Sequence, residues 1–87
     1  MDSIKYRFSK YADVIIGMRK ICISNLQEIT QELTTGLAEF GKRDVDIFVA
    51  DLKYNVYIQH YDSYEVYKLL EKEYSTEILN FIKAYKN

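Results

Sequence analysis

Residues 45–61, VDIFVADLKYNVYIQHY, decide whether this chain folds with or without β-structure. As a helix, the stretch has no apolar stripe, because its polar residues fall all round the helical wheel. As a strand it alternates, and one parity holds Phe48, Ala50, Leu52, Tyr54, Val56 and Ile58. Asp51 and Asn55 are typical turn residues. The stretch therefore predicts a β-hairpin over about residues 45–60 with its tip near Lys53, or else a single long strand.

The stretch before it carries the clearest amphipathic helix, from about Ser24 to Phe40. Its apolar residues recur at spacings of three and four, at Leu26, Ile29, Leu33, Leu37 and Phe40. Ser24 followed by Gln27 fits a capping box. Gly41 lies just past the last apolar residue, where a left-handed C-cap is common. We therefore expect a well-defined helix that ends near Gly41.

The same apolar stripe continues upstream, through Tyr11, Ile15, Met18 and Cys22. It predicts either one long amphipathic helix over about residues 10–40 or a helix pair broken near Ile23. Residues 20–23 have β character, and Gly17 is unfavourable inside a helix, so the pattern leaves open whether residues 14–23 are helix or strand. Residues 4–9 alternate weakly, in the manner of a strand.

A further amphipathic helix is expected over about residues 63–86. Asp62 followed by Glu65 is a capping signal, and the apolar stripe runs through Val66, Leu70, Tyr74, Ile78, Phe81 and Tyr85. Ser75 and Thr76 mark a place where this helix can bend or restart. Further apolar residues widen the stripe: Tyr67, Leu69, Leu79 and Ile82. The helix is therefore expected to contact two surfaces, one of them on a partner or on a second copy of the chain.

Together these elements predict an α+β, helix-rich fold. It has a long amphipathic helix or helix pair (about residues 10–40), a β-hairpin (about 45–60) and a C-terminal helix (about 63–86). An all-α bundle is the alternative. No linker, repeat or low-complexity tract divides the chain, so residues 1–87 are expected to form a single domain.

The composition indicates a folded protein of marginal size. With 87 residues, 48% hydrophobic, 29% charged and a net charge of −1, the chain is typical of globular proteins and not of disordered ones. Its apolar runs fall short of the roughly 18 residues of a membrane span, and charges interrupt its N-terminal part. We therefore expect no membrane association and a cytoplasmic location. A chain this short buries only about 60% of its unfolded surface, so a homodimer is expected.

Residues that carry catalysis or bind metals are scarce. The chain has one histidine and one cysteine, and its three glycines are isolated, so no phosphate-binding loop is expected. His60 has no second ligand at zinc-site spacing, and Cys22 lies in an apolar stretch that is typical of a buried core thiol. Paired carboxylates such as Glu28 and Glu32 fit a solvated helix face better than a general acid and base. We therefore predict that the protein is not an enzyme and has no catalytic, cofactor-binding or metal-binding residues.

Tyrosine is unusually abundant, with nine residues in the chain. Part of this excess is typical of AT-rich coding sequence, but tyrosine also supplies rigid contact area with a polar tip and is frequent at interfaces. Four tyrosines flank the predicted junction of hairpin and C-terminal helix, and we assign them as partner-binding residues: Tyr57, Tyr61, Tyr64 and Tyr67. The chain is thus predicted to be a small non-enzymatic protein–protein interaction module. A bacterial, phage or plasmid inhibitor or regulator that occupies the surface of a protein partner fits this description.

A winged-helix-like DNA-binding regulator is the alternative function. The order of elements fits, with helices before a wing over about residues 45–60 and a dimerising C-terminal helix. The charges fit poorly, because the helix before the expected recognition helix presents Glu28 and Glu32. Nucleic acid is therefore the less favoured partner.

Overall fold

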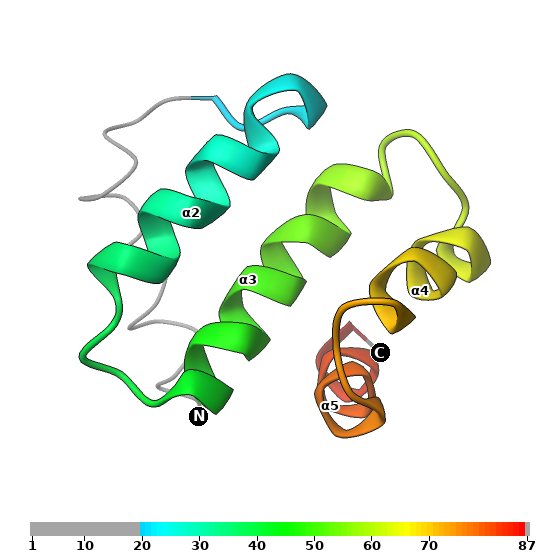
Figure 1. Cartoon of the computed structure of the whole chain (residues 1–87). Coiled ribbons are helices and arrows are strands. Elements are labelled where there is room, and N and C mark those ends of the chain that lie inside the picture. Colours follow the sequence, from blue (N-terminus) through cyan, green and yellow to red (C-terminus); the bar gives the residue numbers. More distant parts are fainter. Residues whose placement is uncertain (1–19, 87) are drawn as a thin grey trace.

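A computed structural model describes residues 20–86 of the chain, and all regular secondary structure within them is helical. A short 3₁₀ turn, η1 (Ile23–Asn25), leads into α2 (Leu26–Gly36), which is followed by α3 (Lys42–Tyr57), α4 (Ser63–Glu71) and α5 (Thr76–Lys86). α3 lies at the centre, with α2 along one side and α4 and α5 on the other (Figure 1). The predicted α+β fold is therefore wrong, and the described residues form an all-helical arrangement. None of these helices combines the length and the apolar character that a membrane crossing requires.

The stretch predicted as a β-hairpin over residues 45–60 belongs to α3, a single helix. This helix packs two apolar stripes into the interior, on opposite sides, instead of one. The first packs against α2 and holds Val45, Phe48, Val49 and Leu52. The second packs against α4 and α5 and holds Ile47, Ala50, Tyr54 and Tyr57. Two interleaved stripes leave polar residues in narrow seams between them, which produces both the scattered wheel and the false alternation of a strand.

One apolar core fills the space between α2 and α3. Ile29 and Leu33 of α2, with Leu37 just after it, pack fully buried against Val45 and Val49 of α3. The two helices run antiparallel, as the short connection between them requires (Figure 1). The spacing of three and four residues therefore predicted the buried face of α2 correctly.

Both ends of α2 differ from the predicted helix. Before its start, the Asn25 Oδ1 accepts a hydrogen bond from the Cys22 backbone N–H at 2.8 Å, in place of a capping box at Ser24. Gly41 is extended, with φ −60° and ψ 152°, and precedes α3 as its N-cap. It therefore does not end α2 in a left-handed turn, and the predicted C-cap is wrong.

Upstream of α2, residues 20–22 are not helical. One continuous helix over about residues 10–40 is therefore wrong as well. The first member of the predicted helix pair and the strand signal at residues 4–9 lie outside the described residues.

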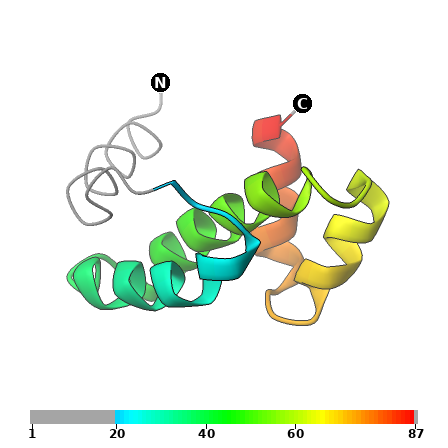
Figure 2. The same cartoon turned by 90° about the horizontal axis from the view of Figure 1, so that it is seen from above.

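The predicted C-terminal helix over residues 63–86 is two helices, α4 and α5, separated by a short turn. Asp62 caps α4 as predicted, because its Oδ1 accepts a hydrogen bond from the Glu65 backbone N–H at 2.9 Å. Ser75 immediately precedes α5, and its Oγ accepts a hydrogen bond from the Ile78 backbone N–H at 3.3 Å. The turn lets α5 cross α3 steeply, which is clear when Figure 1 is compared with Figure 2.

The other half of the interior is built by α3, α4 and α5. Two clusters fill it: Ile47, Ala50, Ile78 and Ile82 between α3 and α5, and Val66, Leu70 and Leu79 between α4 and α5. Leu79 and Ile82, which widened the predicted stripe, are only 5% and 0% exposed. They belong to two neighbouring clusters, one shared with α3 and one with α4, and both clusters lie within this chain. The wide stripe is therefore explained largely by internal packing, and its other two members, Tyr67 and Leu69, are half-buried.

Candidate functional site

The four tyrosines assigned as partner-binding residues divide into two pairs. Tyr61 and Tyr64 lie at the surface, with 44% and 70% of their area exposed. Tyr57 and Tyr67 are half-buried and pack against the core formed by α4 and α5. The fold thus makes Tyr61 and Tyr64 accessible to a partner and uses the other two rings in its own packing.

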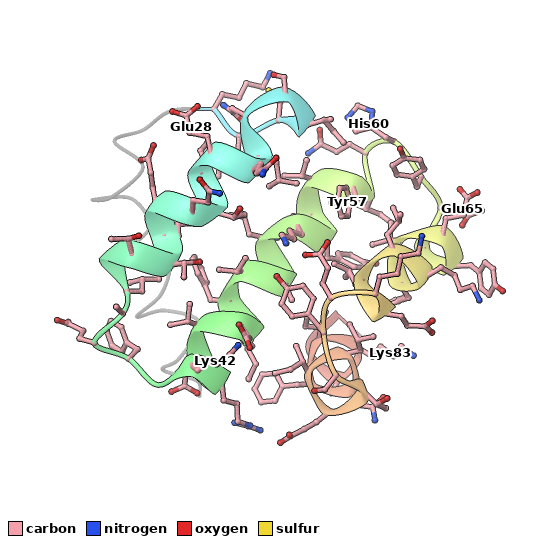
Figure 3. All side chains as sticks on the ribbon, in the orientation of Figure 1. Glu28, Lys42, Tyr57, His60, Glu65 and Lys83 are labelled. Atoms are coloured by element: carbon pink, nitrogen blue, oxygen red, sulfur yellow. The ribbon has the colours of Figure 1, made fainter. Side chains whose placement is uncertain are left out.

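Tyr57 also supports Tyr61. The two rings meet edge to face, with centroids 6.3 Å apart and an interplanar angle of 77°. Aromatic pairs favour this geometry, which adds roughly 0.5–1.5 kcal/mol beyond the burial of area. Tyr57 is fixed in the last turn of α3 (Figure 3), so it restricts the orientations of the Tyr61 ring in the α3–α4 loop. Tyr61 is therefore partly preorganised for contact.

Tyr67 packs between helices and contributes to the fold. Its ring centroid lies 5.4 Å from that of Tyr54, and the Lys83 Nζ lies 4.9 Å from the same centroid. Burial, followed by the charge and hydrogen bond of Tyr54, raises the pKa of Tyr67. Removing Tyr67 would open the contact between α3 and α4, so its role is distinct from that of the exposed tyrosines.

A shallow hollow of about 380 Å³ opens beside Tyr61 on the outer side of α4. Its lining residues are Tyr61, Glu65, Lys68, Leu69, Glu71 and Lys72. Tyr64 borders the hollow, because the Lys68 Nζ lies over its ring at 5.6 Å from the centroid. On this outer side of α4, the Glu65 side chain points away from the other helices (Figure 3). We call Tyr61, Tyr64 and the residues that line this hollow the tyrosine face.

The register of α4 brings the tyrosine face together. One line along α4 and the turn before it holds, at spacings of four and three, Tyr61, Glu65, Leu69 and Lys72. The opposite side of the helix carries Val66 and Leu70, which are fully buried. Sequence reasoning that follows the buried stripe overlooks this outer side. The signal that identifies it is an apolar residue, Leu69, among charged residues at the same helical spacing.

Cys22 lies at the surface, so its assignment as a buried core thiol is wrong. Its Sγ is 3.1 Å from Ser24 Oγ, and this hydrogen bond is the main cause of the lowered pKa of the thiol. Among residues 20–86, no hydrogen bond joins Cys22 to His60, and no three His, Cys, Asp or Glu side chains gather as a metal-binding group. The accessible thiol is a site for chemical labelling.

Cys22 is expected to react with dithionitrobenzoate in the native protein at a rate similar to that of the unfolded chain. The thiol is exposed and its pKa is lowered, so access and ionisation both favour reaction. The Cys22→Ser variant should lose less than about 0.5 kcal/mol of stability, as surface substitutions commonly do. Release of thionitrobenzoate measures the rate, and urea unfolding measures the stability. A thiol that reacts only in denaturant would contradict the exposed position.

A second, more polar depression lies along α3, between α2 and the turn before α5. Two adjoining hollows of about 410 and 480 Å³ share Thr30, Gln31 and Lys53 in their lining. The Lys53 Nζ is 2.5 Å from Glu73 Oε1 and 5.2 Å from the centre of the Tyr74 ring. Burial lowers the pKa of Lys53, but hydrogen bonds to Glu73 and Tyr74 outweigh it, and the net shift is upward. Lys53 is therefore a cation that connects α3 to this turn through Glu73 and Tyr74.

No protein-family model, curated protein or solved structure matches this chain. The function is therefore inferred from its own residues. The tyrosine face combines two exposed aromatic rings with a hollow whose rim is charged.

Proposed function

We propose that this protein is a small non-enzymatic interaction module, an inhibitor or regulator of bacterial, phage or plasmid type, which acts by occupying the surface of another protein. The exposure of Tyr64 and Tyr61, 70% and 44%, beside a hollow is the observation that carries this proposal. Exposed aromatic anchors next to a hollow are typical of protein-binding surfaces. The cytoplasm, a reducing compartment, suits this role, because Cys22 is an exposed free thiol.

Tyrosine anchors suit this task energetically. Each ring offers a large, rigid contact with only about two side-chain torsions, so little conformational entropy is lost on binding. Tyr61 loses still less, because Tyr57 already orients its ring at a centroid separation of 6.3 Å. The charged residues around the hollow, such as Glu65 and Lys68, form a polar rim that sets the choice of partner.

DNA binding through a winged helix is not part of this proposal. The wing of such a fold needs a hairpin over residues 45–60, where the structure has α3. The neighbouring helix α2 carries Glu28 and Glu32 but no basic residue, which is unfavourable for contact with a phosphate backbone. A protein surface is therefore the better-supported target.

Alanine variants of the two exposed tyrosines test the proposed function. Tyr61→Ala and Tyr64→Ala should keep the helical fold, since both side chains lie at the surface. The variant that removes the dominant anchor should weaken partner binding by about thirtyfold. Immobilised wild-type protein captures binding proteins from a bacterial lysate, and isothermal titration then measures each variant against the purified partner.

Two further variants serve as matched controls. Asn80→Ala removes an exposed side chain from α5 that does not line the hollow, and it should bind as the wild type does. Tyr57→Ala removes a half-buried ring, and it should lower the thermal unfolding temperature as well as affinity. A captured partner whose affinity is unchanged in both Tyr61→Ala and Tyr64→Ala would contradict the proposed role of the tyrosine face.

A further inference from the structure

Along the line of the tyrosine face that holds Tyr61, Glu65, Leu69 and Lys72, an acidic residue lies near the start of α4 and a basic residue lies at its end. Glu65 lies in the first turn of this helix, Lys68 lies in its last turn, and Lys72 is its C-cap residue. Elsewhere, opposite charges pair within the chain, as in Lys42–Asp46, Arg43–Glu77 and Lys53–Glu73. Over residues 20–86, no ion pair includes Glu65, Lys68 or Lys72. Glu65 and Lys72 therefore carry opposite charges at the two ends of this line, and neither forms an ion pair within the described residues, whereas the Lys68 ammonium lies over the Tyr64 ring.

When two copies of α4 lie side by side in opposite directions, the acidic end of each copy faces the basic end of the other. We propose that the tyrosine face binds a second copy of this chain, with the two α4 helices antiparallel about a two-fold axis and Glu65 of each copy facing Lys72 of the other. The proposal rests on the proposed function and names a partner for the same face. A second copy supplies the matching pattern by symmetry, whereas an unrelated protein needs its own.

The geometry of α4 allows both cross-pairs to form at once. The two-fold axis passes beside Lys68 and Leu69, midway between Glu65 and Lys72. At about 1.5 Å of rise per residue, each of these charges lies about 5 Å from the axis, on opposite sides. Leu69 of one copy meets Leu69 of the other near the axis, and the apolar stem of Lys68 covers them. Tyr61 of each copy then covers one end of the contact.

The parallel arrangement lacks this complementarity. It places Glu65 against Glu65 and Lys72 against Lys72, so like charges meet at both ends. Antiparallel packing also opposes the two helix dipoles, and the N-terminal end of each helix lies beside the C-terminal end of the other. Glu71 lines the hollow too, but it shares the side of Tyr64 and lies off the line of contact.

The expected contact is small, and the dimer is correspondingly weak. α4 has nine residues, so its outer side buries less than the roughly 1,200 Å² of total surface found in stable interfaces. We expect a dissociation constant on the order of 100 μM. Sedimentation equilibrium over a concentration range from about 10 μM to about 1 mM brackets this value.

Charge reversal provides the test. Glu65→Lys and Lys72→Glu, each made alone, should weaken self-association by about tenfold or more, because the two-fold axis turns one substitution into two like-charge pairs. The double variant Glu65→Lys/Lys72→Glu restores both opposite-charge pairs and should associate within about threefold of the wild type. Mixing the two single variants should also restore association, as a heterodimer. Both residues are exposed, and circular dichroism checks that every variant keeps its helices.

The outcomes separate this proposal from the proposed function. A wild type that stays monomeric at about 1 mM overturns the dimer, as does a double variant that associates no better than the single ones. If such a monomer still captures a different protein through Tyr61 and Tyr64, the interaction function stands without the dimer. In the remaining outcome, the dimer depends on the charges, but Tyr61→Ala and Tyr64→Ala do not weaken binding to any other protein. This outcome supports self-association and contradicts the proposed action on a second protein.

Discussion

Replacing Ile82 by aspartate is expected to remove most of the stability of the protein at pH 7 and clearly less of it at pH 4. Ile82 is 0% exposed on α5 and packs against Ile47, Ala50 and Ile78. A carboxylate in this apolar cluster loses its hydration without gaining a cation, which costs about 4 kcal/mol or more. Domains of this kind are stable by only about 5–15 kcal/mol. The substitution is therefore expected to bring the protein close to unfolding.

The pH dependence of the Ile82→Asp variant follows from the pKa of the new carboxyl group. Burial raises its pKa in the folded state above the value of about 3.9 in the unfolded chain. Below that pH the group is neutral in both states, and only the lost apolar contacts remain. As the pH rises, the unfolded state loses its proton first, so stability falls by up to about 1.4 kcal/mol per pH unit until the folded-state pKa is reached.

Urea unfolding followed by circular dichroism at pH 4 and pH 7 measures this effect. Asn80→Asp places the same side chain on the exposed side of the same helix and is the matched control. The wild type over the same pH range corrects for the native titrating groups. Equal losses in the two variants, or a loss in Ile82→Asp that is the same at both pH values, would contradict the burial of this side of α5.

The Ile47→Ala variant is expected to lose about 3 kcal/mol of stability, within the usual range for truncation of a buried isoleucine. Ile47 is 2% exposed and lies in the cluster with Ala50 and Ile82 between α3 and α5. The three carbon atoms removed leave a cavity that these neighbours only partly fill. Chemical denaturation in urea gives the difference in the free energy of unfolding.

Ile58→Ala is the matched control, because it removes the same atoms at the C-cap of the same helix. Ile58 is 37% exposed, so its loss should be under about 1 kcal/mol. The pair also distinguishes the helix from the hairpin that the alternation suggested. In the hairpin, Ile58 shares the parity of Ala50 and Val56, and Ile47 lies on the other side. A larger loss for Ile58→Ala than for Ile47→Ala would support the hairpin parity.

The parts of the fold that follow from local rules could be predicted from the sequence. The helix with Ile29 and Leu33 has one buried face, and its spacing of three and four residues is unambiguous. The Asp62 cap was also predictable, because a short side chain and the backbone three residues on make the whole interaction. The turn that splits the C-terminal helix at Ser75 left only the weak signal of a serine followed by a threonine.

The central helix was not predictable by the same rule, because its environment is set by tertiary contacts. α3 is covered on two sides, so Val45 and Ile47 are both buried although they point in different directions. A rule that searches for one apolar face does not recognise a helix that is buried on two sides. The prediction that Cys22 is buried was wrong for a related reason. The neighbouring isoleucines suggest burial, but the chain has no regular secondary structure at Cys22, and its side chain is exposed.

The candidate site was predicted in part. Composition and position drew attention to four tyrosines, and two of them, Tyr61 and Tyr64, prove to be exposed. Tyr57 and Tyr67 are indistinguishable from them by sequence, because exposure depends on which side of α3 and α4 meets a neighbour. The hollow between Tyr61 and Leu69 depends on the start and register of α4, which requires the helix break to be known.

The central position of α3 has a consequence for how the chain folds. The main contacts of α2 on one side, and of α5 on the other, are with α3, so neither side can become stable until α3 is in place. Amide protons in the middle of α3, around Ala50, should consequently exchange with solvent only through complete unfolding, and those near the ends of α2 and α5 should exchange through partial opening. The last turn of the same helix carries Tyr57, whose ring contacts Tyr61, so the tyrosine face is attached to the part of the chain that is expected to open last.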